Sequence, residues 1–300
     1  MALPTIGSVP DGRIDPTFVL TISCPDRRGI VAAVAGFLAG HDVDILDSQQ
    51  FGDASTGRFF MRLHLAHEVP RPDAASLRAA FGAPGGPAAA FSMDWALHDT
   101  HRPQRVLVLA STQSHCLDDL LYREQSGALP GVVVGVLANH GELRPLVEAR
   151  GKAFHHVPVG PGTRDAAEDT LLALVAEQSV DLVVLARYMQ VLSPRVCRAL
   201  GGRVINIHHS FLPSFAGAKP YHQAFDRGVK LIGATAHYVT DDLDEGPIIE
   251  QEVARVDHAM GPRELLVAGR DLERLALARA VTWHLQHRVL LNGARTVVFR

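Results

Sequence analysis

The chain has 300 residues, of which 47% are apolar and 20% are charged, a balance typical of a globular protein with a sizeable core. Its net charge is −3, so no basic surface indicates a nucleic-acid partner, and no apolar run reaches the roughly 18 residues that a membrane helix needs. The three cysteines, Cys24, Cys116 and Cys197, lie far apart and form no CxxC pair. Together with an N-terminus that lacks a signal-peptide pattern, they predict a cytoplasmic protein.

Residues 1–16 are rich in Pro and Gly and are expected to form a flexible tail. Residues 17–98 then follow a βαββαβ pattern, which is typical of a small ferredoxin-like domain. The expected strands are 17–26, 43–51, 57–67 and 90–99, and the expected helices run from about Arg27 to Gly40 and from Asp73 to Phe81. The stretch 82–90, "GAPGGPAAA", has the composition of a linker, but a boundary there would orphan the strand that follows. Residues 99–104 are therefore predicted to be the linker.

The pattern changes in residues 105–300, where short and nearly continuous apolar runs alternate with helical segments. The expected strands are 105–110, 132–139, 154–159, 181–186 and 203–208, and the expected helices are 116–126, 142–150, 165–178 and 194–200. Strands buried on both faces predict an α/β domain with a doubly wound, mostly parallel sheet. A strand pair, 231–239 and 247–256, a long helix, 262–288, and an apolar stretch, 296–299, complete it.

Two polar residues, Asn206 and His208, stand at the end of the predicted strand 203–208. Because they lie two residues apart on a strand, both side chains point to the same side, and ligands of parallel sheets bind outside the carboxyl ends of the strands. A Pro- and Gly-broken loop follows with a second polar cluster, Lys219, Tyr221, His222 and Gln223. The alternative interpretation is that Asn206 and His208 only cap the turn before Pro213.

A second strand, 231–239, carries His237 near its end and leads into an acidic loop before Gly246 and Pro247. Such a loop is most often a solvated turn. However, two strand ends with His, amide and carboxylate groups supply what acyl transfer requires, namely a donor for the oxyanion and a base for the nucleophile. The spacing leaves open which of Asp242, Asp244 and Glu245 is the catalytic acid.

The stretches "NIHHSFLPSFAGAKPYHQAFDRG" and "GATAHYVTDDLDEGPII" resemble the formyltransferase-fold family that uses 10-formyltetrahydrofolate. The resemblance begins at Thr17 and includes "CPDRRGIVA", "TGRFFMR", "NHGELRPLVE", "VVLARYMQVLSP" and "KPYHQA". It is closest to the hydrolytic members, which convert 10-formyltetrahydrofolate to formate and tetrahydrofolate. This implies a role in balancing one-carbon folate pools and supplying formate for purine synthesis, with folate as substrate, no further cofactor and no metal.

The resemblance also implies the roles of particular residues. The catalytic trio falls on Asn206, His208 and Asp244, the last chosen by the family's "LDEGP" register, with His237 in support. Asn206 would donate to the oxyanion, and His208, held by Asp244, would pass a proton to the leaving nitrogen. The implied substrate-binding residues are Arg187, Tyr188, Met189, Val191 and Leu192, faced by Val239 and Thr240.

The loop Leu109–Leu120 decides between hydrolase and transferase. Transferases of this family hold the acceptor's phosphate on a Gly-rich loop at this place, whereas this loop has no glycine. Water is then the available nucleophile, although Ser111, Thr112 and Ser114 could offer hydroxyls. The alternatives are a formyltransferase with an unidentified amine acceptor, and an amino-acid sensor without catalysis, against which the complete trio argues.

The N-terminal βαββαβ unit resembles an ACT domain, a small-molecule regulatory module. Its "CPDRRGIVA" turn would place Asp26, Arg28, Gly29 and Ile30 at an effector site for an amino acid. In the resembling hydrolytic proteins, methionine activates and glycine inhibits. The alternative is a purely structural dimerisation domain. Because ACT domains usually pair side by side, a homo-oligomer is expected, without nucleic-acid or membrane partners.

Overall fold

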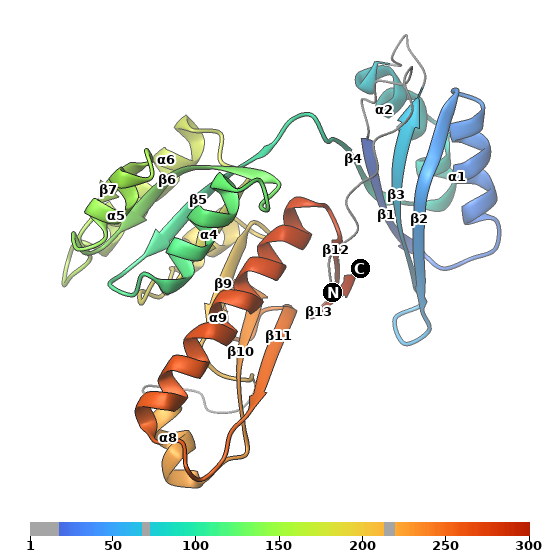
Figure 1. Ribbon diagram of the computed structural model, residues 1–300. Helices are drawn as coiled ribbons and strands as arrows, with labels where there is room; N and C mark the ends of the chain where they lie inside the picture. The colour runs from blue at the N-terminus through green and yellow to red at the C-terminus, as the bar shows by residue number, and fades with distance from the viewer. Residues whose placement is uncertain (1–17, 68–72, 213–219) are drawn as a thin grey trace. The chain divides into compact units, whose positions relative to one another are not determined.

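The computed structural model describes residues 18–67, 73–212 and 220–300 (Figure 1). The tail expected at residues 1–16 lies outside them, as does Lys219. The chain divides into two compact units between Arg102 and Pro103, within the segment expected to be the linker, and Phe299 and Arg300 group with the first unit.

The first unit is a four-stranded sheet with the strand order β2-β3-β1-β4 and three helices against it. Its elements are β1 (Phe18–Pro25), α1 (Ile30–Ala39), β2 (Val43–Asp53), β3 (Arg58–His67), α2 (Ala74–Gly82), α3 (Pro87–Phe91) and β4 (Asp94–Asp99). Alternate residues of β1 (Phe18, Leu20 and Ile22) pack with Ile30 of α1 and Phe81 of α2 in one buried cluster. The period of two along the strand therefore directs one face of the sheet to the helices.

The strand expected from residue 90 begins only at Asp94, which corrects its start. The preceding residues form α3, with Pro87 in its first turn. The fixed φ of proline suits the first turn of a helix, where its missing N–H is not needed. The stretch 82–90 is therefore partly helical.

The second unit is built on a seven-stranded sheet with the order β11-β10-β9-β8-β5-β6-β7. The strands are β5 (Gln104–Ala110), β6 (Gly131–Ala138), β7 (Ala153–His156), β8 (Leu182–Leu185), β9 (Val204–His208), β10 (Leu231–Tyr238) and β11 (Ile248–Arg255). Five strands, from β9 to β7 in that order, pair in parallel, and β10 is antiparallel to both of its neighbours. The prediction of an α/β unit with a mostly parallel sheet is confirmed.

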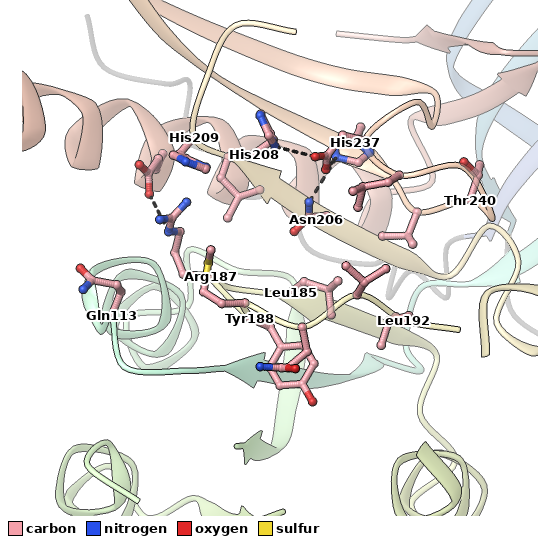
Figure 2. A pocket seen from close by; sticks show the side chains of 18 of the residues that line it. Gln113, Leu185, Arg187, Tyr188, Leu192, Asn206, His208, His209, His237 and Thr240 are labelled. Atoms are coloured by element: carbon pink, nitrogen blue, oxygen red, sulfur yellow. Dashed lines mark hydrogen bonds and ion pairs between the residues drawn. The ribbon is translucent and has the colours of Figure 1, made fainter. Parts of the chain in front are cut away.

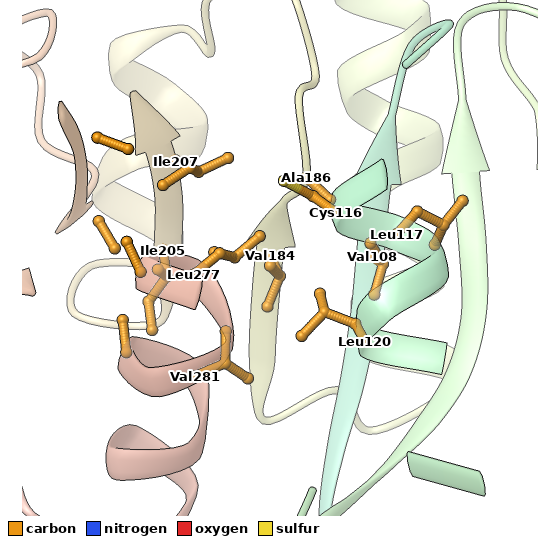
Figure 3. Packing of buried hydrophobic residues seen from close by; sticks show 14 of the residues in the cluster. Val108, Cys116, Leu117, Leu120, Val184, Ala186, Ile205, Ile207, Leu277 and Val281 are labelled. Atoms are coloured by element: carbon orange, nitrogen blue, oxygen red, sulfur yellow. The ribbon is translucent and has the colours of Figure 1, made fainter. Parts of the chain in front are cut away.

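Helices cover both faces of this sheet. They are α4 (His115–Gln125), α5 (Arg144–Ala149), α6 (Arg164–Glu177), α7 (Pro194–Ala199), α8 (Pro220–Arg227) and α9 (Pro262–Leu285). On one face Val108 of β5 and Ile205 of β9 pack against α4 and α9 (Figure 3). On the other face Leu109 of β5 packs with residues of α6 and α7. Apolar runs continuous along each strand are required because both faces are buried.

Three local expectations need correction. The polar cluster after Pro213 was expected in a loop, but from Pro220 to Arg227 the chain is helical. The strand expected at 154–159 ends at His156, before Pro158, which cannot donate a ladder hydrogen bond. The long helix ends at Leu285, and its last expected residues lead into a hairpin of β12 (Val289–Asn292) and β13 (Arg295–Val298). Among the described helices, none is long and apolar enough to cross a membrane.

Candidate active site

The candidate site is built first from two paired strands, β9 and β10. Along β9, Ile205 and Ile207 face the α4/α9 side, so Asn206 and His208 project to the opposite face. Because β10 runs antiparallel to β9, its end does not lie beside the end of β9. Instead, His237 lies directly across from Asn206 in the register of the two strands. The site is thus a cross-strand cluster.

The loop after β10 brings an acid back over these strands. Its residue Asp244 has a φ of 58°, a left-handed conformation that is unusual for a residue other than glycine and typical of functional sites. Two residues later, Gly246 packs so closely on the preceding strand that a Cβ atom there would lie 1.7 Å from the carbonyl oxygen of Tyr238. The Gly-Pro pair therefore folds the acidic loop onto β10 and sets the position of Asp244.

Asp244 joins His208 and His237, which are both labelled in Figure 2. Its carboxylate is 3.1 Å from Nδ1 of His208 and 3.6 Å from Nε2 of His237. The hydrogen bond from His208 is the largest cause that holds the pKa of Asp244 well below its usual range. Among the three acids that spacing left open, Asp244 is thus the one paired with His208, while Asp242 borders the cavity and Glu245 is exposed.

The other nitrogen of His208, Nε2, has no hydrogen-bond partner among the described residues. His208 is 6% exposed, and its Nε2 atom is fully buried without any hydrogen-bond partner in the described part of the chain. A buried polar atom without a partner costs about 1–3 kcal/mol unless a ligand satisfies it. Because Nδ1 is held by an ionised carboxylate, Nε2 is the atom available for proton transfer to a bound substrate.

Asn206 is oriented by His237, whose Nε2 lies 3.2 Å from Nδ2 of Asn206. The Nδ1 atom of His237 is 2.9 Å from the carbonyl oxygen of Tyr238, which can only accept, so Nδ1 carries the hydrogen. In the neutral ring Nε2 then accepts a hydrogen bond from the amide of Asn206. The second N–H of that amide is left to donate to a ligand.

A cavity of about 590 Å³ adjoins these side chains. All of the residues predicted from sequence to bind substrate line it together with the predicted trio and His237 (Asn206, His208, Asp244; Arg187, Tyr188, Met189, Val191, Leu192, Val239, Thr240). Met189 and Val191 on one wall and Leu243 on the other are more than half exposed. Large apolar side chains left open in this way form surfaces suited to a flat ring system.

Sequence reasoning missed the opposite end of the cavity, where Glu273 of α9 is 1% exposed. His115 lies 2.7 Å from its carboxylate and the hydroxyl of Tyr221 donates to it at 2.7 Å. Arg187 forms an ion pair with it at 3.4 Å. The sequence signal that could have found this end is that Gly269 and Glu273 interrupt the otherwise apolar stripe of α9. Gly269 is required there because a Cβ at this position would lie 2.1 Å from the ring of Tyr221.

Three residues at this end (His115, Cys116 and Glu273) have side-chain atoms of metal-ligand type within 4.8 Å of one another. The His and the Glu are hydrogen-bonded to each other. Burial, and then the charge of Glu273, raises the pKa of the Cys116 thiol. In this structure His115 and Glu273 therefore form a hydrogen-bonded pair at the wall of the cavity.

The predicted effector residues lie in the first unit, where β1 leads into α1. Gly29 has a φ of 95° and its carbonyl begins the helix by accepting from Ala33. The side chain of Ile30 is buried in the core, while Asp26 and Arg28 are exposed. The exposed pair and the backbone at Gly29 are therefore the groups that a small molecule can reach.

Comparisons with known proteins agree with this architecture. Residues 104–281 match the formyl transferase family and residues 18–82 match the ACT domain family. A formyltetrahydrofolate deformylase of a Corynebacterium species is 52% identical, with 94% of this chain and 98% of that protein covered. The crystal structure of a formyltetrahydrofolate deformylase from Burkholderia mallei is 49% identical with a TM-score of 0.89, covering 95% of this chain and all of that one.

A glycinamide ribonucleotide transformylase from Symbiobacterium toebii is 29% identical with a TM-score of 0.63, and it covers only 66% of this chain but 95% of its own. Fold and site together therefore define a protein of the formyl transferase class that carries an ACT domain. The high identity over nearly the whole chain makes the assignment more specific. The chain belongs to the formyltetrahydrofolate deformylase family.

Proposed function

We propose that this protein hydrolyses 10-formyltetrahydrofolate to formate and tetrahydrofolate, with Asn206, His208 and Asp244 as its catalytic residues. The observation that carries the proposal is the Nε2 atom of His208, which is buried and has no partner in the described part of the chain, while the opposite nitrogen pairs with Asp244. The pteridine ring would lie between the apolar walls at residues 188–192 and 239–243. The formate released would return one-carbon units to purine synthesis and would balance the folate pool.

The proposed chemistry uses two groups, the second amide N–H of Asn206 as a donor and Nε2 of His208 as an acceptor. As a water oxygen bonds to the formyl carbon, the lone pair on Nε2 of neutral His208 takes a proton from that water. The formyl oxygen becomes an oxyanion, to which the free N–H of Asn206 donates. Asp244 stabilises the imidazolium through Nδ1. The proton on Nε2 then passes to the folate nitrogen as the C–N bond breaks, and the formic acid released loses its own proton to solvent.

Contacts of the loop Leu109–Leu120 favour water over an amine acceptor. Of the three hydroxyls that sequence left available there, Ser111 is 3% exposed and already donates to Asn139 while accepting from the amide of Met189. The amide oxygen of Gln113 accepts from Arg270. Ser111 and Gln113 are thus engaged within the protein, whereas Thr112 and Ser114 are exposed, so the loss of the first two groups to internal contacts is what supports hydrolysis.

The test is product stoichiometry with no amine present. The purified protein is incubated with 10-formyltetrahydrofolate in an amine-free buffer, and formate and tetrahydrofolate are measured separately. We expect catalytic turnover with the two products in a one-to-one ratio. Turnover that starts only when an amine is added, with a formamide as product, would establish a transferase instead.

We also propose that the ACT domain receives an amino acid at Asp26, Arg28 and Gly29. The family match and the accessible turn before α1 support this. Initial rates with added methionine or glycine test it in the wild type and in Arg28→Ala. An effect of either amino acid that disappears in the variant supports the proposal, whereas rates indifferent to both amino acids contradict it.

A further inference from the structure

Arg187 is held in an unusual way at the wall of the catalytic cavity. It follows β8, its φ is 62°, and its side chain is only 14% exposed. Within the described residues its single charged partner is Glu273, which faces Nε at 3.4 Å. The guanidinium carries five N–H donors, and none of them, the buried Nε included, forms a hydrogen bond to a described residue. The backbone strain, on the order of 1–3 kcal/mol, indicates a position that the fold maintains for a purpose.

The carboxylate that holds Arg187 is fixed from two other sides. Glu273 receives hydrogen bonds from His115 and Tyr221, and Tyr221 fits against α9 only because residue 269 is a glycine. These bonds, and the charge of Arg187, keep the pKa of Glu273 below its usual value despite burial, so Glu273 is ionised. Glu273 contacts the Nε side of Arg187 as an ion pair, yet Nε has no hydrogen-bond partner among the described residues, and neither terminal nitrogen bonds to one of them.

The balance of charge at this end of the cavity is positive. Arg270 also lines it, and its guanidinium is bonded to the neutral amide of Gln113. His209, which lies on the same side as Arg187 in Figure 2, stays neutral because burial and then the charge of Arg187 lower its pKa to about 4. Among the described residues at this end of the cavity, Arg187 and Arg270 thus outnumber the single carboxylate of Glu273. A partly buried cation without its full set of acceptors favours an anionic ligand.

We propose that the terminal nitrogens of Arg187 form a binding site for a small planar carboxylate, and that its ligand is the formate produced in the reaction. This inference rests on the proposed hydrolysis. The fork of a guanidinium matches a carboxylate with two parallel hydrogen bonds. Formate arises in the same cavity beside His208, whose ring is 5.1 Å from that of His209. Capture by Arg187 draws the anion away from the leaving nitrogen, and formate accordingly acts as a product inhibitor.

The proposal is tested by binding of ¹³C-labelled formate without folate. Line broadening of the formate signal is titrated at constant ionic strength in the wild type, in Arg187→Lys and in Arg195→Gln. We expect saturable binding in the wild type and at least a tenfold weaker affinity in Arg187→Lys, which keeps the charge beside Glu273 but lacks the fork. Arg195, an exposed arginine paired with Asp169, is the matched control, and its loss should leave formate binding unchanged. Equal binding by the wild type and Arg187→Lys overturns the site.

Two further measurements complete the test. The first shows whether the bound carboxylate is formate or belongs to the folate, and the second shows whether the anion site or the proposed hydrolysis fails. If tetrahydrofolate displaces labelled formate competitively, Arg187 serves the carboxylate tail of the folate instead, whereas simultaneous binding of both supports the product site. If the wild type releases formate in turnover but binds none saturably, the hydrolase assignment stands and the anion site fails. If it binds formate but releases none, the anion site stands and the hydrolase assignment fails.

Discussion

Asn206 and His237 lie directly opposite each other on two antiparallel strands, with Nδ2 of Asn206 3.2 Å from Nε2 of His237. His237 is 2% exposed, and its other nitrogen is held by the backbone of Tyr238. The histidine is therefore a fixed acceptor that orients the amide of Asn206 and leaves one N–H for the oxyanion. Asn206 acts on the substrate, and His237 positions it.

Replacing Asn206 should slow the chemical step. In Asn206→Ala the oxyanion loses its donor, and we expect kcat to fall by roughly 100- to 1,000-fold, the usual cost of losing one such donor. KM should change little because the donor acts on charge that develops in the transition state. Steady-state formate release measures both constants. A kcat within fivefold of the wild type would contradict the role given to Asn206.

Gly246→Ala should lower kcat by displacing the loop that carries Asp244, although Gly246 itself does not contact the substrate. The added Cβ would lie 1.7 Å from the carbonyl oxygen of Tyr238, so the loop that holds Asp244 must move. A displacement of about 1 Å at a catalytic group costs on the order of 100-fold in rate, which is the loss of kcat that we expect.

The matched control is Gly36→Ala, at an exposed position in α1 where an added methyl group would have nothing within 4 Å. This change should stabilise the first unit by about 0.5–1 kcal/mol because it removes the conformational freedom of a helical glycine. It should leave kcat unchanged. A Gly246→Ala enzyme as active as Gly36→Ala would show that the loop tolerates displacement.

Leu243 should contribute binding energy and little else. It is 65% exposed while lining the cavity, so a bound ring would cover it. In Leu243→Ser we expect KM for the folate to rise about tenfold, from the loss of roughly 1–2 kcal/mol of apolar contact. Val253→Ser, at a 51% exposed position on β11 away from the cavity, is the control. Equal KM values in the two variants would show that the pteridine ring of the folate does not contact Leu243.

His98 should make the first unit less stable in acid. Burial, with Arg78 and Arg62 nearby, lowers the pKa of His98 to about 4, whereas an unfolded histidine has a pKa of about 6.5. Above that value both states are neutral and stability is full. As pH falls through 6.5 toward 4, the unfolded chain alone binds the proton, so stability is lost.

Amide hydrogen exchange of β1 and β4 at pH 7 and pH 5, in the wild type and in His98→Gln, measures this effect. The wild type should lose more protection than the variant between the two values, because glutamine does not titrate. The same change in protection for both proteins would mean that His98 is not the group responsible.

The sequence predicted most of the fold because the apolar periods are unambiguous. Short continuous apolar runs such as Leu182–Leu185 are typical of strands buried on both faces, and their alternation with helical segments indicates a parallel sheet. The helix from Pro220 to Arg227 was missed because the glycines and prolines before it resemble a loop. The short helix at Pro87 was missed for the same reason, since helix starts and turns share these residues.

Some residues of the site could be predicted from local spacing, whereas others depend on backbone conformation and packing. Asn206 and His208 stand two residues apart, so the period of a strand brings them together. Which acid of the 241–245 loop meets them depends on the left-handed φ of Asp244 and on the close packing of Gly246, neither of which spacing reveals. Glu273 lies 65 residues from His208 and reaches the cavity only through the packing of α9. No local pattern predicts such a contact.

The most direct test of the account is single-turnover formate release by Asp244→Asn beside Asp242→Asn. Both acids belong to the same loop and both line the cavity, but only Asp244 pairs with His208. The account predicts a loss of about 100-fold or more in Asp244→Asn, because Nδ1 of His208 loses the charge that stabilises its protonated form, and a rate within a few-fold of the wild type in Asp242→Asn. Equal rates in the two variants would contradict the claim that Asp244 and His208 form the proton-transfer pair.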